Sequence, residues 1–225
     1  MPADRLVPVP TGVTDQQAAA MMLKGMTAWY LIRRTHQVKP GETILIHAAA
    51  GGVGLIVCQW AKHLGATVIG TVGDDDKARL VRANGCDHPI NYRREDFVAR
   101  VNDITHGRKL PVVYDSVGKD TFYKSLDCLA PLGLMASFGQ SSGAIGPVDI
   151  GILAGKGSLF LTRPTLNTYV AAREDLLTAA RELFEAVGSG AVRISINQTY
   201  PLREAGRAHR DLQDRKTTGQ TVLTV

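Results

Sequence analysis

The sequence contains few cysteines and few aromatic residues, and it has no long hydrophobic run. Its 225 residues include only three cysteines, widely spaced and without a C-x-x-C pair, which excludes a disulfide framework and a zinc ribbon. No stretch approaches the roughly 20 consecutive apolar residues that a membrane-spanning helix needs. The N-terminal segment MPADRLVPVP lacks the apolar core of a secretory signal. These absences favour a reducing setting, and we expect a cytoplasmic protein.

The excess of positive charge is also small, since 26 Lys and Arg residues against 21 Asp and Glu residues give a net charge of +5. The densest basic stretch, residues 203–216, interleaves Glu204, Asp211 and Asp214 among its cations, which is typical of a solvated helix face. A continuous basic stripe and aromatic stacking platforms are both missing. Nucleic acid is therefore not the expected partner, and the modest positive field suits a smaller anionic ligand.

Short β-branched runs alternate with helical patterns through the middle of the chain. The expected strands are 42–48, 67–72, 88–92, 110–117, 134–139 and 158–162. Helical patterns separate most of these runs, and the connections are short. Such alternation implies parallel strands joined by right-handed crossovers, so we predict an α/β fold with a doubly wound parallel sheet.

The two flanks do not continue this alternation. Thr14 and Gln17 have the spacing of a capping box, which predicts a helix that is interrupted at Gly25 and ends before Pro40. After the sixth strand we expect two helices, at 168–187 and 203–214, and two short strands, at 194–196 and 220–225. The segment 164–225 is therefore predicted to belong to a second structural unit.

A glycine-rich turn, H-A-A-A-G-G-V-G at residues 47–54, joins the first strand to the following helix. Gly51 would let the backbone approach a pyrophosphate, and a helix beginning near Gly52 offers free N–H donors. Gly54 would allow close packing of helix on strand, whereas Ala49 replaces the first glycine of the strict G-x-G-x-x-G pattern. The motif therefore indicates a dinucleotide site, with a ligand-free tight turn as the competing interpretation.

The choice between NAD and NADP depends on the end of the second strand. An acidic residue about 20 positions beyond the loop is typical of NAD enzymes, and Asp74 is 20 residues after Gly54. The strand itself ends at Gly73, which would leave room for a 2′-phosphate with Lys77 one helical turn further on. The residues alone leave both cofactors open and favour NADP slightly.

The segments HAAAGGVGLIVCQWAKHLGATVIGTVG, NYRREDF, VVYDSVGKDTF, SLDCLAPLGLMASFGQSSG and GSLFLTRP together resemble one family. They are similar to the NADPH-dependent quinone oxidoreductases, the zinc-free, zeta-crystallin-like branch of the medium-chain dehydrogenase/reductases. The resemblance implies a Rossmann domain, NADPH as cofactor, no metal, and hydride transfer to a quinone or related conjugated carbonyl. An enoyl or alkenal reductase of the same superfamily and a non-catalytic NADPH- or RNA-binding module are the alternatives.

The resemblance also implies roles for individual residues. Lys77, Tyr92 and Arg215 match positions that hold the adenosine 2′-phosphate, with Gly73 leaving space for it. Gly52 and Val53, which follow Gly51, match the pyrophosphate loop, and Tyr30 matches a residue near the cofactor. The loop along the nicotinamide side is matched by Phe138, Gly139, Gln140 and Ser141, and the segment facing the carboxamide by Thr162. Three consecutive aspartates, residues 74–76, depart from the family's pattern and should weaken phosphate binding unless their side chains point outward.

The resemblance finally implies how the chain is divided. Residues 1–23 match a connector or remnant of a GroES-like catalytic domain, 24–163 the Rossmann domain, and 164–225 the returning segment of the catalytic domain. In the family a leading catalytic domain precedes the position of Met1, so we expect catalytic residues largely outside this chain. We expect the chain to bind NADPH yet reduce quinones poorly. A homodimer through the strand at 158–162 is also implied.

Overall fold

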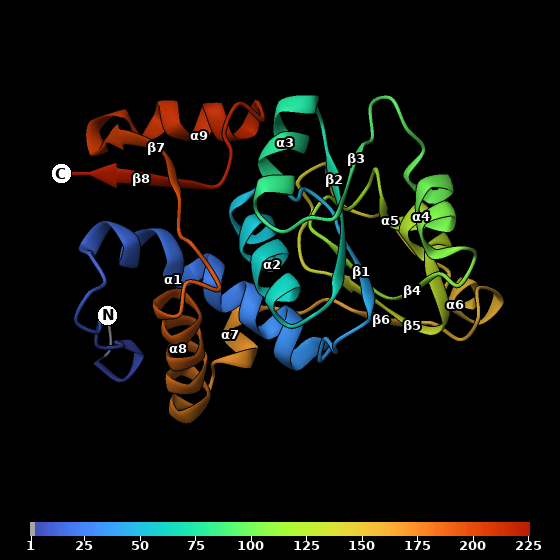
Figure 1. Cartoon of the computed structure of the whole chain (residues 1–225), viewed down its shortest axis with the longest axis horizontal. Coiled ribbons are helices and arrows are strands. Elements are labelled where there is room, and N and C mark those ends of the chain that lie inside the picture. The colour runs from blue at the N-terminus through green and yellow to red at the C-terminus, as the bar shows by residue number, and fades with distance from the viewer. Residues whose placement is uncertain (1–2) are drawn as a thin grey trace.

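The structure is a computed structural model that describes residues 3–225. The strands are β1 (Thr43–Ile46), β2 (Thr67–Val72), β3 (His88–Asn91), β4 (Leu110–Asp115), β5 (Leu129–Ser137), β6 (Phe160–Thr162), β7 (Ile196–Pro201) and β8 (Gln220–Thr224). The α-helices are α1 (Asp15–Tyr30), α2 (Gly52–His63), α3 (Asp75–Ala83), α4 (Phe97–Thr105), α5 (Phe122–Asp127), α6 (Gly151–Gly155), α7 (Leu166–Tyr169), α8 (Arg173–Gly188) and α9 (Ala205–Gln213). Figure 1 shows their arrangement.

Six strands form one sheet in the order β3-β2-β1-β4-β5-β6, and every neighbouring pair is parallel. The order reverses between β1 and β4, which is the topological switch point of a doubly wound sheet. The predicted fold class is therefore confirmed. In such sheets, ligands bind beyond the carboxyl ends of the strands, close to this reversal.

Alternate residues of the central strands enter two separate hydrophobic layers. In β1, Ile44 and Ile46 belong to the layer built with α1, α2 and α8, whereas Leu45 belongs to the layer built with α4 and α5. All three side chains are fully buried. Because both faces of the sheet are covered, the strands are continuously apolar rather than alternating with polar residues.

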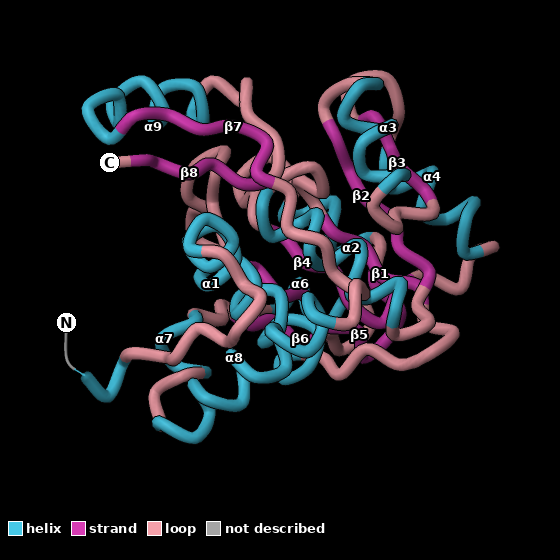
Figure 2. The backbone as a smooth tube through the Cα atoms, turned by 60° about the vertical axis from the view of Figure 1, so that its left-hand side comes forward, coloured by secondary structure: helices cyan, strands magenta, loops and turns pink. Residues whose placement is uncertain are grey.

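The two C-terminal strands form a small sheet of their own. β7 and β8 pair in parallel, and α9 connects them. Figure 2 shows this β7–α9–β8 lobe set apart from the six-stranded sheet. Of the helices within residues 3–225, none is both long and apolar enough to cross a bilayer.

Two of the predicted helix boundaries were wrong. The helix α1 runs through Gly25 without interruption. The glycine serves packing instead, because a Cβ there would lie only 2.6 Å from Cδ1 of Leu183 in α8. The capping box of Thr14 and Gln17 is confirmed. The single helix expected at 168–187 is divided into α7 and α8, separated at Val170 and the two residues that follow it.

Candidate functional site

The turn between β1 and α2 has the geometry that the glycine pattern predicts. Ala48 adopts a left-handed φ of 52°, and Gly51 is the N-cap of α2 with an extended backbone. A Cβ on Gly54 would lie 2.5 Å from the carbonyl oxygen of Ala49, so the helix packs here against the turn before it, and a side chain has no room. The first amides of α2 have no intrahelical acceptor, and they carry the positive end of the helix dipole. This helix end is suited to an anion.

The far C-terminal part of the chain lies against the same turn. The Gly219 N–H donates to the carbonyl oxygen of Ala50 at 2.8 Å, and Gly51 and Gly219 form an isolated parallel bridge. The Gln220 side-chain amide donates to the carbonyl oxygen of Gly52 at 3.0 Å. Sequence reasoning missed Gly219 and Gln220, because no local pattern indicates that β8 returns to residues 168 positions earlier.

A second group of residues gathers at the carboxyl end of β2. Lys77 Nζ donates to the main-chain carbonyl of Arg215 at 2.8 Å, and Arg215 Nη1 donates to the Tyr92 hydroxyl at 3.5 Å. A Cβ on Gly73 would lie 3.0 Å from that hydroxyl. The structure thus brings together four of the predicted residues from three distant segments, and we call Gly73, Lys77, Tyr92 and Arg215 the Gly73 group. Two cations and a phenol beside a glycine form an arrangement that suits a phosphate group.

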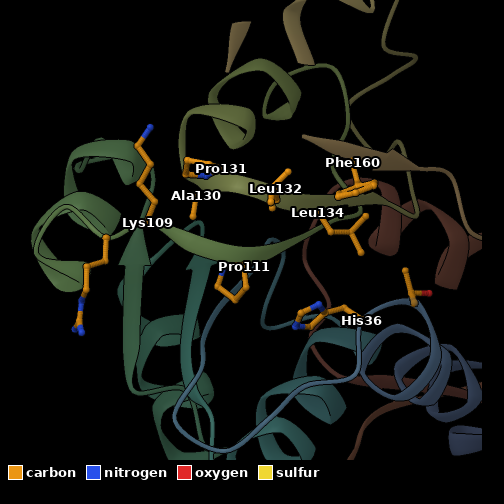
Figure 3. Close-up of a pocket in the computed structure, with 11 residues that line it drawn as sticks. His36, Lys109, Pro111, Ala130, Pro131, Leu132, Leu134 and Phe160 are labelled. Atoms are coloured by element: carbon orange, nitrogen blue, oxygen red, sulfur yellow. The ribbon is translucent and has the colours of Figure 1, made fainter. Parts of the chain in front are cut away.

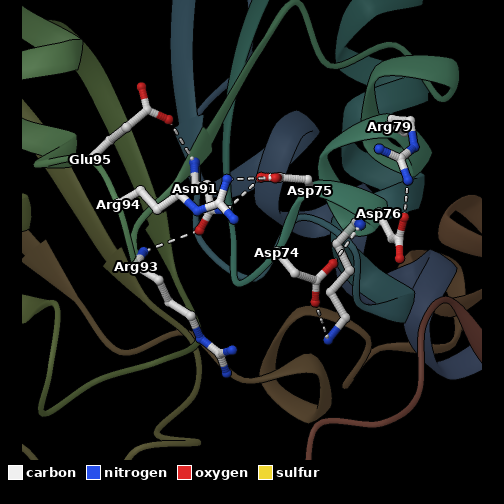
Figure 4. A network of polar contacts seen from close by, with 9 residues as sticks. Asp74, Asp75, Asp76, Arg79, Asn91, Arg93, Arg94 and Glu95 are labelled. Atoms are coloured by element: carbon white, nitrogen blue, oxygen red, sulfur yellow. Dashed lines mark hydrogen bonds and ion pairs between the residues drawn. The ribbon is translucent and has the colours of Figure 1, made fainter.

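Arg93 lies beside the Gly73 group, although sequence reasoning missed it. Its Nε would lie 3.8 Å from a Cβ on Gly73, and its side chain is exposed. Among residues 3–225 no carboxylate lies within ion-pair distance of its guanidinium. Figure 4 shows Arg94 reaching Asp75 while the Arg93 guanidinium lies apart from it. The position of Arg93 directly after Tyr92 at the end of β3 is the signal that could have found it.

Two of the three consecutive aspartates are occupied by partners of their own (Figure 4). Asp75 accepts hydrogen bonds from Asn91 Nδ2 at 2.8 Å and from Arg94 Nη1 at 2.7 Å. The Asn91 hydrogen bond and the positive charge of Arg94 lower the pKa of Asp75. Asp76 pairs with Arg79 one turn along α3. Both carboxylates are thereby neutralised by arginines outside the Gly73 group.

Asp74 is the exception, because it faces Lys77. Its carboxylate caps α3 by accepting from the Lys77 backbone N–H at 2.8 Å, and it also lies 3.5 Å from Lys77 Nζ. Asp74 therefore holds the Lys77 side chain beside the other residues of the Gly73 group. A bound phosphate has to share Lys77 with this carboxylate, which reduces the net attraction.

The residues matched to the nicotinamide side follow the carboxyl ends of β5 and β6. Phe138 is half-buried, and its N–H donates to the carbonyl oxygen of Asp115 at 2.8 Å. A Cβ on Gly139 would lie 2.7 Å from the carbonyl oxygen of Ser116, so the chain passes too close there for a side chain. The residues that complete this set are the exposed Gln140 and Ser141 and the half-buried Thr162 at the end of β6. They share the carboxyl edge of the sheet with the glycine turn.

Tyr30 lies at the end of α1 and is almost fully buried. Its ring stacks on Tyr169 with 4.6 Å between centroids. Burial, together with the neighbouring Tyr169, raises the pKa of Tyr30 to about 12, so its hydroxyl stays protonated at neutral pH. This environment suits a core residue equally well, and its role beside a cofactor stays a prediction.

His47, to which the sequence assigns no role, bridges β2 and α5 inside the protein. The Ser125 hydroxyl donates to the carbonyl of Thr121 at 2.8 Å, so it accepts from the His47 Nε2–H at 2.9 Å. Nδ1 lies 2.8 Å from the Thr71 hydroxyl, which donates to it when the ring is neutral. Burial lowers the pKa of His47, against the opposing charge of Asp115. The ring thus fixes the backbone immediately before the glycine turn.

A cavity lies elsewhere, away from these residues. It encloses about 600 Å³ and is lined by residues at the start of β4, along β5 and at the start of β6, among them Pro111, Leu134 and Phe160 (Figure 3). No residue of the glycine turn or of the Gly73 group lines it. This cavity is therefore separate from the predicted binding residues.

Comparison with known proteins places the chain in a family. The family model described as zinc-binding dehydrogenase matches residues 52–185. A quinone oxidoreductase of Pseudomonas aeruginosa is 54% identical over 220 residues, covering 98% of this chain and 68% of the relative. The chain belongs to the quinone oxidoreductase family. A 2-haloacrylate reductase of a Burkholderia species is 49% identical over 228 residues, covering 99% of this chain and 68% of that protein.

Solved structures of quinone oxidoreductases have the same fold as this chain. The structure of the Escherichia coli quinone oxidoreductase complexed with NADPH matches with a TM-score of 0.97 at 52% identity, covering 99% of this chain and 69% of that one. The quinone oxidoreductase of Pseudomonas syringae matches with a TM-score of 0.98 at 49% identity, covering 100% and 69%. The resemblance noted in the sequence is therefore confirmed.

The family model carries zinc in its description, but the residues described do not fit a zinc site. Within residues 3–225 no three His, Cys, Asp or Glu side chains come together as a metal-binding group. The cysteines Cys58, Cys86 and Cys128 are all buried, whereas structural or catalytic zinc needs three or four converging ligands. No zinc-dependent step is assigned to this member of the quinone oxidoreductase family.

Proposed function

We propose that the chain binds NADPH and serves a reductase that passes hydride from this cofactor to a quinone. The observation that carries the proposal is the group formed by Lys77, Tyr92 and Arg215 around Gly73, because only NADPH has a phosphate at the ribose 2′ position. The quinone oxidoreductase names of the relatives and the NADPH complex of the E. coli protein support it. When bound, NADPH supplies the hydride, and a proton completes the hydroquinone.

Each part of the carboxyl edge has a role in this proposal. Gly51, Gly52 and Val53 present backbone amides to the pyrophosphate, and the Gly73 group holds the 2′-phosphate. The nicotinamide ring is held by the residues that follow β5 and β6 and by the end of α1, namely Tyr30, Phe138, Gly139, Gln140, Ser141 and Thr162. These residues orient the ring and exclude water, and the reactivity belongs to the cofactor.

The division of the chain and its partner are part of the same proposal. We propose a Rossmann domain at 24–163, flanked by 1–23 and 164–225 as parts of a catalytic domain. We also propose a homodimer through the edge strand β6, where Phe160 is 60% exposed and Leu161 39% exposed. Light scattering at micromolar concentration should report a dimer, and Phe160→Lys should shift it toward monomer. A monomeric parent chain would contradict the dimer.

An activated alkene is the second candidate acceptor, because the 2-haloacrylate reductase is 49% identical to this chain. Both reactions take hydride from the same bound NADPH, and they differ only in the acceptor that is reduced. Steady-state NADPH oxidation with a simple benzoquinone and with 2-chloroacrylate, measured side by side, separates the two. Turnover only with the alkene would replace the quinone proposal.

Calorimetric titration with NADPH and NADH tests the cofactor proposal. Lys77→Ala and Arg215→Ala should each weaken NADPH binding by about tenfold, since each removes one charge-assisted contact at a partly exposed site. Neither substitution should change NADH affinity. Lys39→Ala removes the same charge from an exposed turn before β1 and is the matched control. Equal affinity for both cofactors, unaffected by either substitution, would overturn the assignment.

A further inference from the structure

Lys24 lies on α1 beside the beginning of α2. Its side chain is half-buried, and its stem covers the first residue of that helix. A Cβ on Gly52 would lie 2.3 Å from Lys24 Cδ and 2.9 Å from Cε. The absence of a side chain at Gly52 is therefore what admits the lysine to this corner.

The ammonium of Lys24 has no compensating charge within the described part of the chain. No carboxylate between residues 3 and 225 lies within ion-pair distance of it, and Nζ makes no hydrogen bond to these residues. Its surroundings are the positive end of the α2 dipole and the neutral amide of Gln220. Burial lowers the pKa of Lys24, with no nearby anion to oppose it. An unpaired, partly desolvated cation beside a helix N-terminus costs stability unless an anion joins it.

The side chain of Gln220 lies at the same corner. Its side chain is 2% exposed, and its Nε2 donates to the Gly52 carbonyl, but its Oε1 is buried without a donor within residues 3–225. That oxygen would lie 2.9 Å from a Cβ on Gly52. A buried acceptor without a partner is expensive, so natural structures retain few of them. An amide oxygen can only accept a hydrogen bond, so it attracts the Lys24 ammonium, whereas that ammonium and the free amides of α2 are the groups at this corner that suit an anion.

We propose that Lys24 is a ligand of the dinucleotide pyrophosphate and raises the affinity for NADPH and NADH alike. This inference rests on the proposed function, because it needs a dinucleotide at the end of α2. The contrast with Lys62, at the opposite end of the same helix, supports it. Lys62 Nζ pairs with Asp87 Oδ1 at 2.6 Å beside the negative end of the dipole, as a lysine with a structural role does.

The test compares Lys24→Met, which keeps the length and the apolar packing of the stem, with Lys62→Met as the matched control. Titration of the whole chain with NADPH and with NADH should show Lys24→Met weakening both by the same factor, about 10- to 100-fold. Its ligand-free resistance to urea should be unchanged or greater than that of the parent. Lys62→Met should lower resistance to urea and leave both affinities unchanged, and Lys24→Arg should restore much of the binding.

Each opposite result overturns the inference. Unchanged affinities for Lys24→Met would show that Lys24 does not touch the ligand. A loss of affinity together with a loss of ligand-free stability would show a structural role. A loss confined to NADPH would move Lys24 to the 2′-phosphate. If the parent chain binds neither NADPH nor NADH, the proposed function itself fails. That outcome is seen in the parent chain, whereas the outcomes above are seen only in the Lys24 variants.

Discussion

Folding stability should depend on pH through His47, because this ring is buried and hydrogen-bonded as the neutral form. Thr71 and Ser125 hydrogen-bond its two nitrogens, and the ring is shut off from the water that would solvate a positive charge. Burial lowers the pKa of His47 in the folded protein. In the unfolded chain the ring faces water and takes up a proton near pH 6.5. The unfolded state therefore binds more protons below that pH, and stability falls as the pH is lowered.

The size of the effect follows from this difference in proton binding. If His47 stays neutral in the folded state, lowering the pH from 7.5 to 5.5 removes about 1.4 kcal/mol of unfolding free energy. For a chain of this length that loss lowers the melting temperature by about 3–6 °C. Carboxylates with lowered pKa values, such as Asp75 and Asp87, lose their contribution only at lower pH, when they become protonated.

Urea unfolding at pH 5.5, 6.5 and 7.5 measures this dependence. His47→Gln should cost about 1–3 kcal/mol at pH 7.5, because it disturbs two buried hydrogen bonds. It should also flatten the pH dependence between 5.5 and 7.5, since glutamine does not titrate. His63→Gln, at the exposed end of α2, is the matched control and should keep the parent slope. A slope in His47→Gln as steep as in the parent would refute the reasoning.

Two further substitutions test the packing of the site. Gly54→Ala should lower the free energy of unfolding in urea by about 1–3 kcal/mol. The new Cβ would meet the backbone carbonyls of Ala49 and Ala48 at 2.5 and 2.6 Å, and backbone atoms cannot move aside. Unchanged stability would contradict the close packing. Arg93→Gln should leave the free energy of unfolding within about 0.5 kcal/mol of the parent value, as expected for an exposed residue. Because Arg93 lies beside Gly73, the same substitution should weaken NADPH binding severalfold in calorimetry without changing NADH binding. Equal losses for both cofactors would place Arg93 away from the 2′-phosphate.

The strands of the main sheet were readable from sequence because their apolar runs are bounded by turn residues. Residues 67–72 were expected as a strand, and β2 has those bounds. The helix at Gly25 was misread because a glycine in a helical pattern indicates weak local propensity, whereas the packing of Leu183 on Gly25 is a tertiary contact. β5 begins at Leu129, five residues before the expected start, and its irregular first part includes Leu132 in a left-handed conformation.

The site was predictable to the extent that its residues follow the strands. Lys77 and Tyr92 come just after β2 and β3, and parallel strands bring such positions to one edge of the sheet. The roles of Tyr92 and Arg215 were found only through the family resemblance, and the place of Arg215 depends on how α9 and β8 return. Lys24 carries no local signal at all. Its importance is visible only when its unpaired charge is seen beside Gly52.

The bridge between Gly51 and Gly219 has a consequence for biosynthesis. During translation the glycine turn leaves the ribosome long before β8, since Gly52 and its partner Gln220 are 168 residues apart. The six-stranded sheet can form while the turn still lacks its C-terminal cover, because every strand of that sheet precedes residue 163. Contacts between segments this far apart in the sequence cost loop-closure entropy before they contribute stability. Dinucleotide binding is thus an assay for the finished chain, and nascent chains stalled before Gly219 should fold their sheet while binding the cofactor weakly.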